Sequence, residues 1–302
     1  MSITMKIFLS IGLPIYNGEE FLEKKLSSVL TQTHENFELI ISDNASTDKT
    51  QEICKKFQNL DKRIKYFRQN NNIGPIKNFG FVLNQAKYNY FLWTSVDDFL
   101  DPTFIEKNLH ELEKNSSLVA SVSKIGTNHY LDRHQKTNDQ KYYEFIKKIR
   151  NLIRPRQFLS LTGKYEEKTR TYLKKSSCMM IYSIFRTESL KKSFFEKSFL
   201  GNDWAICLNI LKFGELNVID EILIYQYERG LTGKGMISSI KAHDEKSSFI
   251  LPWYPFTKWC MKNLGIKFIF RNIDYFIQLN IEGFTSLTID FFYSLFYYKK
   301  YY

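Results

Sequence analysis

Hydrophobic residues in the first 125 positions form short continuous runs that alternate with stretches of helical periodicity. Strand-like runs cover residues 6–13, 37–42, 64–67, 88–94 and 118–123. Between the runs, apolar residues recur three or four positions apart, as they do at Leu22, Leu26 and Val29. Strands separated by helices predict an α/β fold with a mostly parallel, Rossmann-like sheet and helices on both faces.

The alternation ends near residue 126. Residues 141–175 contain eleven Lys/Arg and three Glu, which predicts either a solvated helix and loop or a contact surface for phosphate or anionic lipid. Beyond them, the pattern predicts a buried strand at Met179–Phe185, a buried helix at 204–213 and a last strand at Val218–Tyr227.

The last 50 residues hold 17 aromatic residues, six Lys/Arg and three acids. Apolar residues here fall at helical spacing, as at Ile269, Ile273, Phe276 and Ile277. This pattern predicts helices that either pack on the sheet domain or lie at the surface of an anionic membrane.

Composition narrows the setting. The 302 residues are 43% hydrophobic with a net charge of +11, which is typical of a globular protein with an anionic partner. Four widely spaced cysteines predict neither a zinc site nor a disulfide framework. Without a signal-peptide layout or an 18-residue apolar run, we expect a cytoplasmic protein, with peripheral contact at the inner face of the cell membrane as an open alternative.

Polar clusters follow four of the expected strands at or just beyond their ends. They are Pro14-Ile-Tyr-Asn17 with Glu19, the run from Ser42 to Thr50, the run from Asn70 to Asn78, and Ser95-Val-Asp97-Asp98. Each cluster taken alone fits a turn or a helix cap. Because parallel strands bind ligands at their carboxyl ends, four such clusters together predict a ligand crevice at that edge.

In order and spacing these clusters resemble family 2 glycosyltransferases of the GT-A fold, the class that builds bacterial surface polysaccharides. The resemblance covers residues 6–228 and implies a GT-A domain at 1–235. Its nucleotide-binding half would be 1–125 and its acceptor half 126–235, followed by a basic, aromatic, helical region at 236–302.

The resemblance implies a role for each cluster. Asp43 would accept a hydrogen bond from the nucleotide base, usually uracil, as a carboxylate can. The remaining donor contacts implied in the first three clusters are Pro14, Tyr16, Asn17, Glu19, Asn72, Gly74, Lys77 and Asn78. In the fourth cluster, Ser95 stands where the family's Asp-x-Asp motif has its first acid.

The resemblance also implies a divalent cation, Mn²⁺ or Mg²⁺, held by Asp97 and Asp98. Ser95 and Val96 would then face the donor. A hard cation needs few protein carboxylates when a diphosphate supplies oxygens. The missing first acid leaves the metal affinity and the ribose contact open.

Two further residues complete the expected site. Asp203 matches the family's general base, which would deprotonate the acceptor hydroxyl. Alternatively, Asp203 only caps the helix that follows it. Arg229, with Lys234 on the next glycine-flanked loop, would contact the leaving diphosphate.

The sequence therefore predicts an inverting glycosyltransferase that uses a nucleotide sugar, most simply UDP-linked. Its acceptor would be a growing surface glycan or a lipid-linked oligosaccharide. The alternative is a catalytically inactive binding protein, which Ser95 and Asn202 keep open because each replaces a family acid. A nucleotidyltransferase would carry a Gly- and Lys/Arg-rich phosphate loop after the first strand, and no nucleic-acid module is recognisable, so we expect no nucleic-acid partner.

Overall fold

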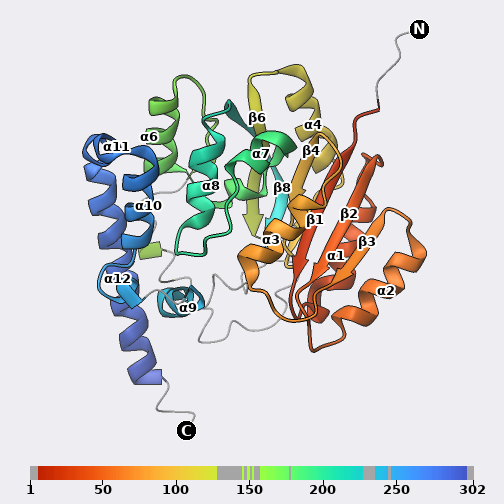
Figure 1. Ribbon diagram of the computed structural model, residues 1–302, viewed down its shortest axis with the longest axis horizontal. Helices are drawn as coiled ribbons and strands as arrows, with labels where there is room; N and C mark the ends of the chain where they lie inside the picture. Colours follow the sequence, from red (N-terminus) through yellow and green to blue (C-terminus); the bar gives the residue numbers. More distant parts are fainter. Residues whose placement is uncertain are drawn as a thin grey trace.

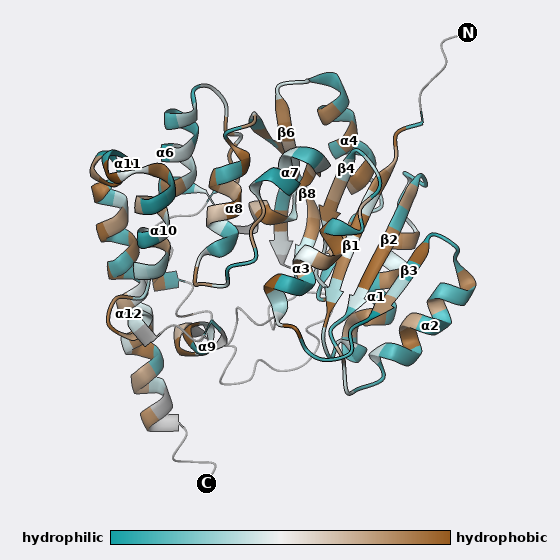
Figure 2. Ribbon diagram, viewed as in Figure 1, coloured by the Kyte–Doolittle hydropathy of each residue, from teal (hydrophilic) through white to brown (hydrophobic). Residues whose placement is uncertain are grey.

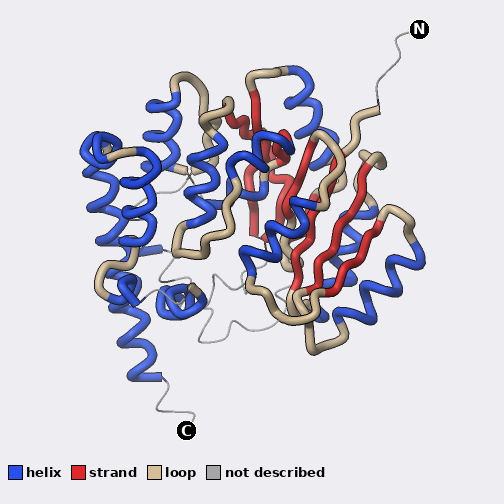
Figure 3. The backbone as a smooth tube through the Cα atoms, viewed as in Figure 1, coloured by secondary structure: helices blue, strands red, loops and turns tan. Residues whose placement is uncertain are grey.

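A computed structural model describes most of the chain around one eight-stranded sheet (Figure 1). The described residues are 6–127, 145, 148–149, 152, 157–176, 178–226, 235–243 and 246–297. The strand order is β3-β2-β1-β4-β7-β6-β8-β5. Helices lie on both faces of the sheet (Figure 3), which confirms the fold class expected from the alternating pattern.

The first half of the chain supplies four parallel strands and the helices between them. The strands are β1 (Leu9–Ile15), β2 (Phe37–Asp43), β3 (Ile64–Arg68) and β4 (Tyr90–Trp93). The helices are α1 (Glu19–Leu30), α2 (Thr50–Leu60) and α3 (Pro75–Asn84). The strands are mostly hydrophobic (Figure 2), and β2 and β4 are buried along their whole length. Burial on both faces explains why these strands appear in the sequence as continuous apolar runs.

Residues 98–226 add four more strands. They are β5 (Asp98–Leu100), β6 (Leu118–Thr127), β7 (Ile184–Arg186) and β8 (Glu215–Gln226). The accompanying helices are α4 (Phe104–Lys114), α6 (Tyr165–Lys175), the 3₁₀ helix η2 (Cys178–Tyr182), α7 (Thr187–Ser193) and α8 (Asn202–Ile210).

One of the predicted strands is mostly helical in the structure. The run Met179–Phe185 is mostly the 3₁₀ helix η2, and β7 begins only at Ile184. Both parts of this short apolar run are buried, since Met180 in η2 and Ile184 in β7 are inaccessible to solvent. Hydrophobicity alone therefore does not separate a strand from a turn of helix at this length.

Strand directions bring most carboxyl ends to one edge of the sheet. β7 is antiparallel to both β4 and β6, so β6 runs in the same direction as β4. β8 is parallel to β6. Consequently β1, β2, β3, β4, β6 and β8 all end at the same edge, which lies at the bottom of Figure 1.

The C-terminal region is helical, as expected. It contains α9 (Gly235–Ala242), the 3₁₀ helix η4 (Lys246–Phe249), α10 (Tyr254–Leu264), α11 (Ile266–Arg271) and α12 (Ile273–Tyr297). The Trp204 ring on α8 contacts the rings of Trp253, Phe256 and Tyr275, with centroids 6.0 to 6.3 Å apart. One side of this region therefore packs on the sheet domain. No helix in the described part of the chain is long and apolar enough to cross a membrane.

Candidate functional site

The loop after β1 is tied to the loop after β2 through Asn17. Its backbone is left-handed (φ 50°), which asparagine tolerates better than most residues. Its side-chain oxygen accepts the Thr47 N–H at 2.8 Å, and its own N–H donates to the Ser46 hydroxyl at 2.9 Å. The two loops are thus held together before any ligand arrives.

The start of α1 reinforces this link. The Glu19 N–H donates to Asp48 at 3.0 Å, and the Lys49 N–H donates back to the Glu19 carboxylate at 2.9 Å. Glu19 therefore braces the two loops, whereas the sequence assigned it to the donor. Pro14 is half-buried and Tyr16 is exposed beside it, so Tyr16 is the residue of this loop with a side chain free to meet a ligand.

Asp43, at the end of β2, is fully buried and already receives three hydrogen bonds. The donors are the Ser46 N–H at 2.8 Å, the Tyr66 hydroxyl at 2.7 Å and the Arg68 guanidinium at 2.6 Å. Burial and the Asp43 carboxylate raise the pKa of Tyr66, so this hydroxyl remains a donor. Asp43 therefore holds the exposed Arg68 at the carboxyl edge of the sheet, and because Asp43 is fully buried, direct contact with a base would require the residues around it to move.

In the segment after β3, one predicted contact residue is buried and two others are exposed. Asn78 is 2% exposed, and its amide exchanges two hydrogen bonds with Ser42, accepting from the hydroxyl at 2.6 Å and donating to the carbonyl at 2.9 Å. This pairing occupies Asn78 and fixes α3 against β2, in place of the expected donor contact. Asn72 and Lys77 are exposed at the same edge, and Gly74 (φ 83°) supplies the bend between them.

The fourth cluster separates the two adjacent acids. Asp97 is half-buried and accepts a hydrogen bond from the Ser95 hydroxyl, while Val96 between them is also half-buried. Asp98 begins β5 and is 3% exposed, and one of its carboxylate oxygens has no hydrogen-bond partner among the residues that the structure describes. Burial raises the pKa of Asp98 to about 7, reinforced by Asp97 and opposed by Lys25.

The burial of Asp98 changes the set of residues that we expect to bind the metal ion. Asp98 is enclosed in the protein, so we retain only Asp97 as a candidate ligand. Within the described ranges, no three His, Cys, Asp or Glu side chains cluster as a metal site would require. One carboxylate is compatible with Mg²⁺ or Mn²⁺ only when substrate phosphates and water complete the shell, because these ions bind few protein groups in such sites.

Asp203 lies in the first turn of α8. The helix begins at Asn202, and Gly201 (φ 92°) occupies the cap position, so Asp203 is not the cap. The half-buried carboxylate accepts the Trp204 N–H at 2.9 Å. Since α8 precedes β8 and runs back along it, its first turn lies toward the edge where β8 ends (Figure 1). Arg229 and Lys234 lie outside the described residues.

The sequence did not identify two charged residues that contact the site. Lys25 lies on the buried face of α1, at helical spacing from Leu22 and Val29, and its position on that face could have identified it. Arg68 ends β3 at the carboxyl edge, where its position after the strand was the available signal. Lys25 donates to the backbone carbonyl of Asp98, and Arg68 donates to the carboxylate of Asp43.

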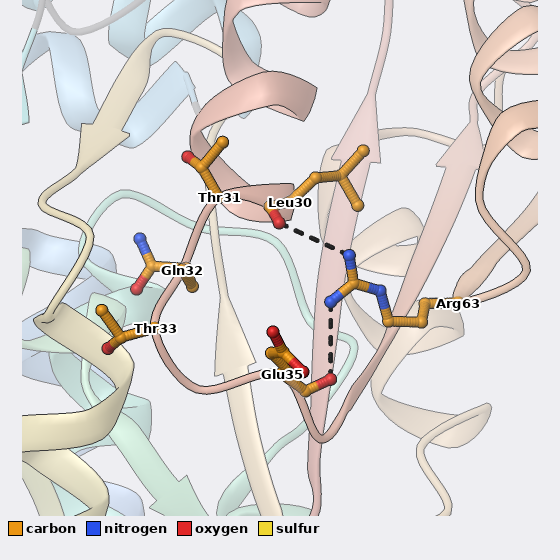
Figure 4. A pocket seen from close by; sticks show the side chains of 6 residues that line it. All are labelled: Leu30, Thr31, Gln32, Thr33, Glu35 and Arg63. Atoms are coloured by element: carbon orange, nitrogen blue, oxygen red, sulfur yellow. Dashed lines mark hydrogen bonds between the residues drawn. The ribbon is translucent and has the colours of Figure 1, made fainter.

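A hollow of about 590 Å³ lies at the opposite edge, where α1 ends and β2 begins (Figure 4). Its lining residues are Leu30, Thr31, Gln32, Thr33, Glu35 and Arg63. Arg63 donates to the carbonyls of Leu30 and Glu35 at 3.4 Å, so its guanidinium is used to join loops. This hollow is separate from the strand ends that carry the predicted site.

Comparison with solved structures supports the fold. The mannosyltransferase PcManGT from Pyrobaculum calidifontis, solved with GDP-Man and Mn²⁺, has a TM-score of 0.59 at 12% identity, over 97% of this chain and 76% of that one. The S. aureus TarS fragment 1–349, solved with UDP-GlcNAc, has a TM-score of 0.56 at 18% identity, over 91% and 82%. These likenesses show the GT-A fold.

Sequence comparison gives closer relatives over shorter stretches. Glycosyltransferase GlyA of Streptococcus pneumoniae serotype 4 is 36% identical over 99 residues, which are 32% of this chain and 14% of GlyA. An uncharacterised glycosyltransferase of Haemophilus influenzae is 35% identical over 115 residues, which are 38% of this chain and 36% of the relative. The model of the family named "Glycosyl transferase family 2" matches residues 10–194, more than half of the chain. The protein therefore belongs to glycosyl transferase family 2.

Proposed function

We propose that this protein is an inverting glycosyltransferase that moves a sugar from a nucleotide-diphosphate donor to an acceptor hydroxyl. The observation that carries the proposal is the common sheet edge shared by the linked loops after β1 and β2, the Asp97 turn and the first turn of α8 with Asp203. Family membership supports the same chemistry. We further propose that the acceptor is a growing surface glycan or a lipid-linked oligosaccharide.

The Asp43–Arg68 pair supports recognition of a pyrimidine base. A uracil ring presents one N–H donor between two carbonyl acceptors, so it matches a carboxylate beside a guanidinium. Arg68 is exposed where Asp43 is buried, so Arg68 would meet the base first. We therefore propose UDP as the nucleotide. TarS is described with UDP-GlcNAc and PcManGT with GDP-Man, which supports the nucleotide-sugar class and makes GDP the alternative to test.

Asp97 would hold the divalent cation against the diphosphate. The bound cation would neutralise negative charge on the departing diphosphate. The Ser95 hydroxyl orients Asp97 through its hydrogen bond, which fits a site where a single carboxylate must be fixed. Lys77 and Arg229 would add positive charge near the phosphates. Tyr16, Asn72, Gly74 and Val96 would line the donor.

Asp203 would act as the general base. It takes the proton of the acceptor hydroxyl as that oxygen bonds to the anomeric carbon and the bond to the diphosphate oxygen breaks. The positive end of the α8 dipole favours the ionised carboxylate that this step requires. Because the attack and the departure occur on opposite faces of the sugar ring, the anomeric configuration inverts.

A donor screen tests this function. The wild-type protein is assayed with UDP- and GDP-sugars and Mn²⁺, with donor binding measured separately by calorimetry. Asp203→Asn should lower kcat by about 10²- to 10⁴-fold while the donor still binds, and Asp97→Asn should weaken metal-dependent donor binding. Asp220→Asn, an exposed acid on β8, is the matched control and should leave both unchanged.

The same screen decides the alternative function. Ser95 and Asn202, at positions where the family often carries acids, favour a nucleotide-sugar-binding protein without catalysis. Tight donor binding with neither hydrolysis nor transfer to any glycan or lipid-linked acceptor would establish that alternative. Activity that is unchanged in Asp203→Asn would remove Asp203 from the role of base.

A further inference from the structure

Helix α12 presents a row of apolar side chains to solvent. Its exposed hydrophobic residues recur mostly three or four positions apart, and they are Ile273, Ile277, Ile281, Phe284, Phe291, Phe292 and Leu295. Each is about half exposed. The same spacing continues back into α11 through Phe270, which is 69% exposed, and Ile266. We call these nine residues the outer face.

The buried side of α12 is apolar in its first turns and carries polar groups farther on. Glu282 is 1% exposed, and Ser286 and Asp290 are also buried. Asp290 accepts hydrogen bonds from the backbone N–H groups of Met236 and Ile237 at the start of α9. A helix between water and a protein core places carboxylates outward and isoleucines inward. From Glu282 onward α12 does the reverse, with acids buried and Phe284, Phe291, Phe292 and Leu295 about half exposed, so water is a poor match for its outer face.

The one exposed acid of α12 is already paired. Asp274 forms ion pairs with Lys174 and, at 3.5 Å, with Arg170. Both partners lie on α6, on the sheet-domain side of the helix. No carboxylate in the described part of the outer face is left to oppose a negatively charged surface.

The helices beside the outer face are basic. Lys258 and Lys262 on α10 and Lys267 on α11 are exposed, and none has an ion-pair partner among the residues that the structure describes. Arg271 pairs with Glu166. A second copy of the chain meeting this region face to face would bring two sets of lysines together, which disfavours self-association. An anionic lipid surface instead matches both the apolar face and its charge.

We propose that the outer face of α11 and α12 docks the protein on an anionic membrane, with both helices lying in the interface. A contiguous exposed apolar stripe marks a contact surface, and basic residues near it select anionic headgroups. The inference deepens the proposed function by naming the surface from which a lipid-linked acceptor would be reached. It does not depend on catalysis, because membrane binding is measured without a donor.

Vesicle co-sedimentation of the full chain tests the proposal. The wild type should bind phosphatidylcholine vesicles containing about 30% phosphatidylglycerol and should bind pure phosphatidylcholine about tenfold or more weakly. Ile277→Glu/Ile281→Glu should reduce binding to anionic vesicles by about 100-fold. Leu60→Glu alters an exposed leucine away from the outer face, at the end of α2, and is the control that should bind normally.

A second variant separates lipid contact from misfolding. Lys258→Glu/Lys262→Glu leaves the outer face intact and should weaken binding to anionic vesicles with no change in thermal midpoint. Wild-type protein that binds neither vesicle type, or Ile277→Glu/Ile281→Glu that binds like wild type, would overturn the proposal. So would a wild-type dimer in sedimentation equilibrium that Ile277→Glu/Ile281→Glu dissociates, since the face would then join two copies. Failure of docking with intact donor hydrolysis leaves the proposed function standing.

Discussion

The ammonium group of Lys25 donates a 2.6 Å hydrogen bond to the backbone carbonyl oxygen of Asp98. Lys25 is fully buried on α1, and Asp98 is buried at the start of β5. Burial lowers the pKa of Lys25 to about 8, although Asp98 and then Asp97 oppose that shift. The buried ammonium group of Lys25 therefore holds the turn that carries Asp97 in place.

Removing this cation should destabilise the protein. Lys25→Met leaves the Asp98 carbonyl without its donor and the carboxylate without a nearby positive charge, at a cost of about 2–4 kcal/mol. Adding Asp98→Asn to Lys25→Met should recover part of the loss, because the unmatched charge is gone. Denaturant unfolding of the two single variants and the double variant measures this coupling. Strictly additive effects would show that the two residues do not act together.

Arg68 should control nucleotide affinity. Arg68→Met removes the exposed guanidinium and leaves Asp43 with one donor fewer, so the Kd for UDP should rise about 10- to 100-fold. Arg63→Met makes the same change at the opposite edge of the sheet and should leave that Kd within about twofold. Titration calorimetry with UDP compares the two. Equal losses from both variants would rule out the proposed contact.

Asn78 should contribute to stability and not to donor binding. Asn78→Ala removes both bonds to Ser42, so the buried hydroxyl loses its acceptor and keeps only the bond it receives from Gln69 at 3.0 Å, at a cost of about 1–3 kcal/mol. The Kd for UDP measured below the melting transition should stay within about twofold. A large loss of affinity in a stable variant would instead return Asn78 to the ligand site.

Glu38 should make stability depend on pH in the acid range. Burial alone would raise the pKa of Glu38, but hydrogen bonds from Lys65, from the Ser10 hydroxyl at 2.7 Å and from the Lys87 N–H at 3.1 Å outweigh it and hold that pKa below its usual value of 4.5. Its stabilisation is present above about pH 4.5 and is lost as pH falls through the lower folded-state pKa.

Glu38→Gln measures that contribution. In denaturant unfolding at pH 7, the free energy of unfolding of the variant should be about 2 kcal/mol lower than that of wild type, and this difference should shrink toward pH 3. Glu23→Gln changes an exposed glutamate and is the control, with little effect at either pH. A gap that stays constant across this range would contradict the assignment.

The sequence predicted the fold best where burial in the core determines the residue pattern. Strands β1, β2 and β4 are apolar because both of their faces are covered, so continuous apolar runs locate them. It failed between Met179 and Phe185, where a short apolar run is buried as a helical turn and tertiary packing decides the conformation. It also missed β5, since three residues carry too little pattern to be recognised.

For the site, the sequence identified residue types but not their surroundings. Asp97 and Asp98 are chemically identical neighbours, and only the strand geometry turns one outward and encloses the other. Asp43 was correctly expected at a strand end, yet its partners Tyr66 and Arg68 come from β3, more than twenty residues away. Such pairings depend on strand register, which a single sequence does not reveal.

The reversed strand β7 has a consequence for how the sheet deforms. It connects β4 to β6 through three residue pairs on one side, from Tyr90–Arg186 to Leu92–Ile184, and two on the other. Strands β4 and β6 pair with their other neighbours, β1 and β8, over more residues, so the pairing through β7 is comparatively short. Bending at β7 would have to pull Asp98 on β5 away from Lys25 on α1, so we expect this buried contact to limit such bending and to keep Asp97 near the same edge as Asp203.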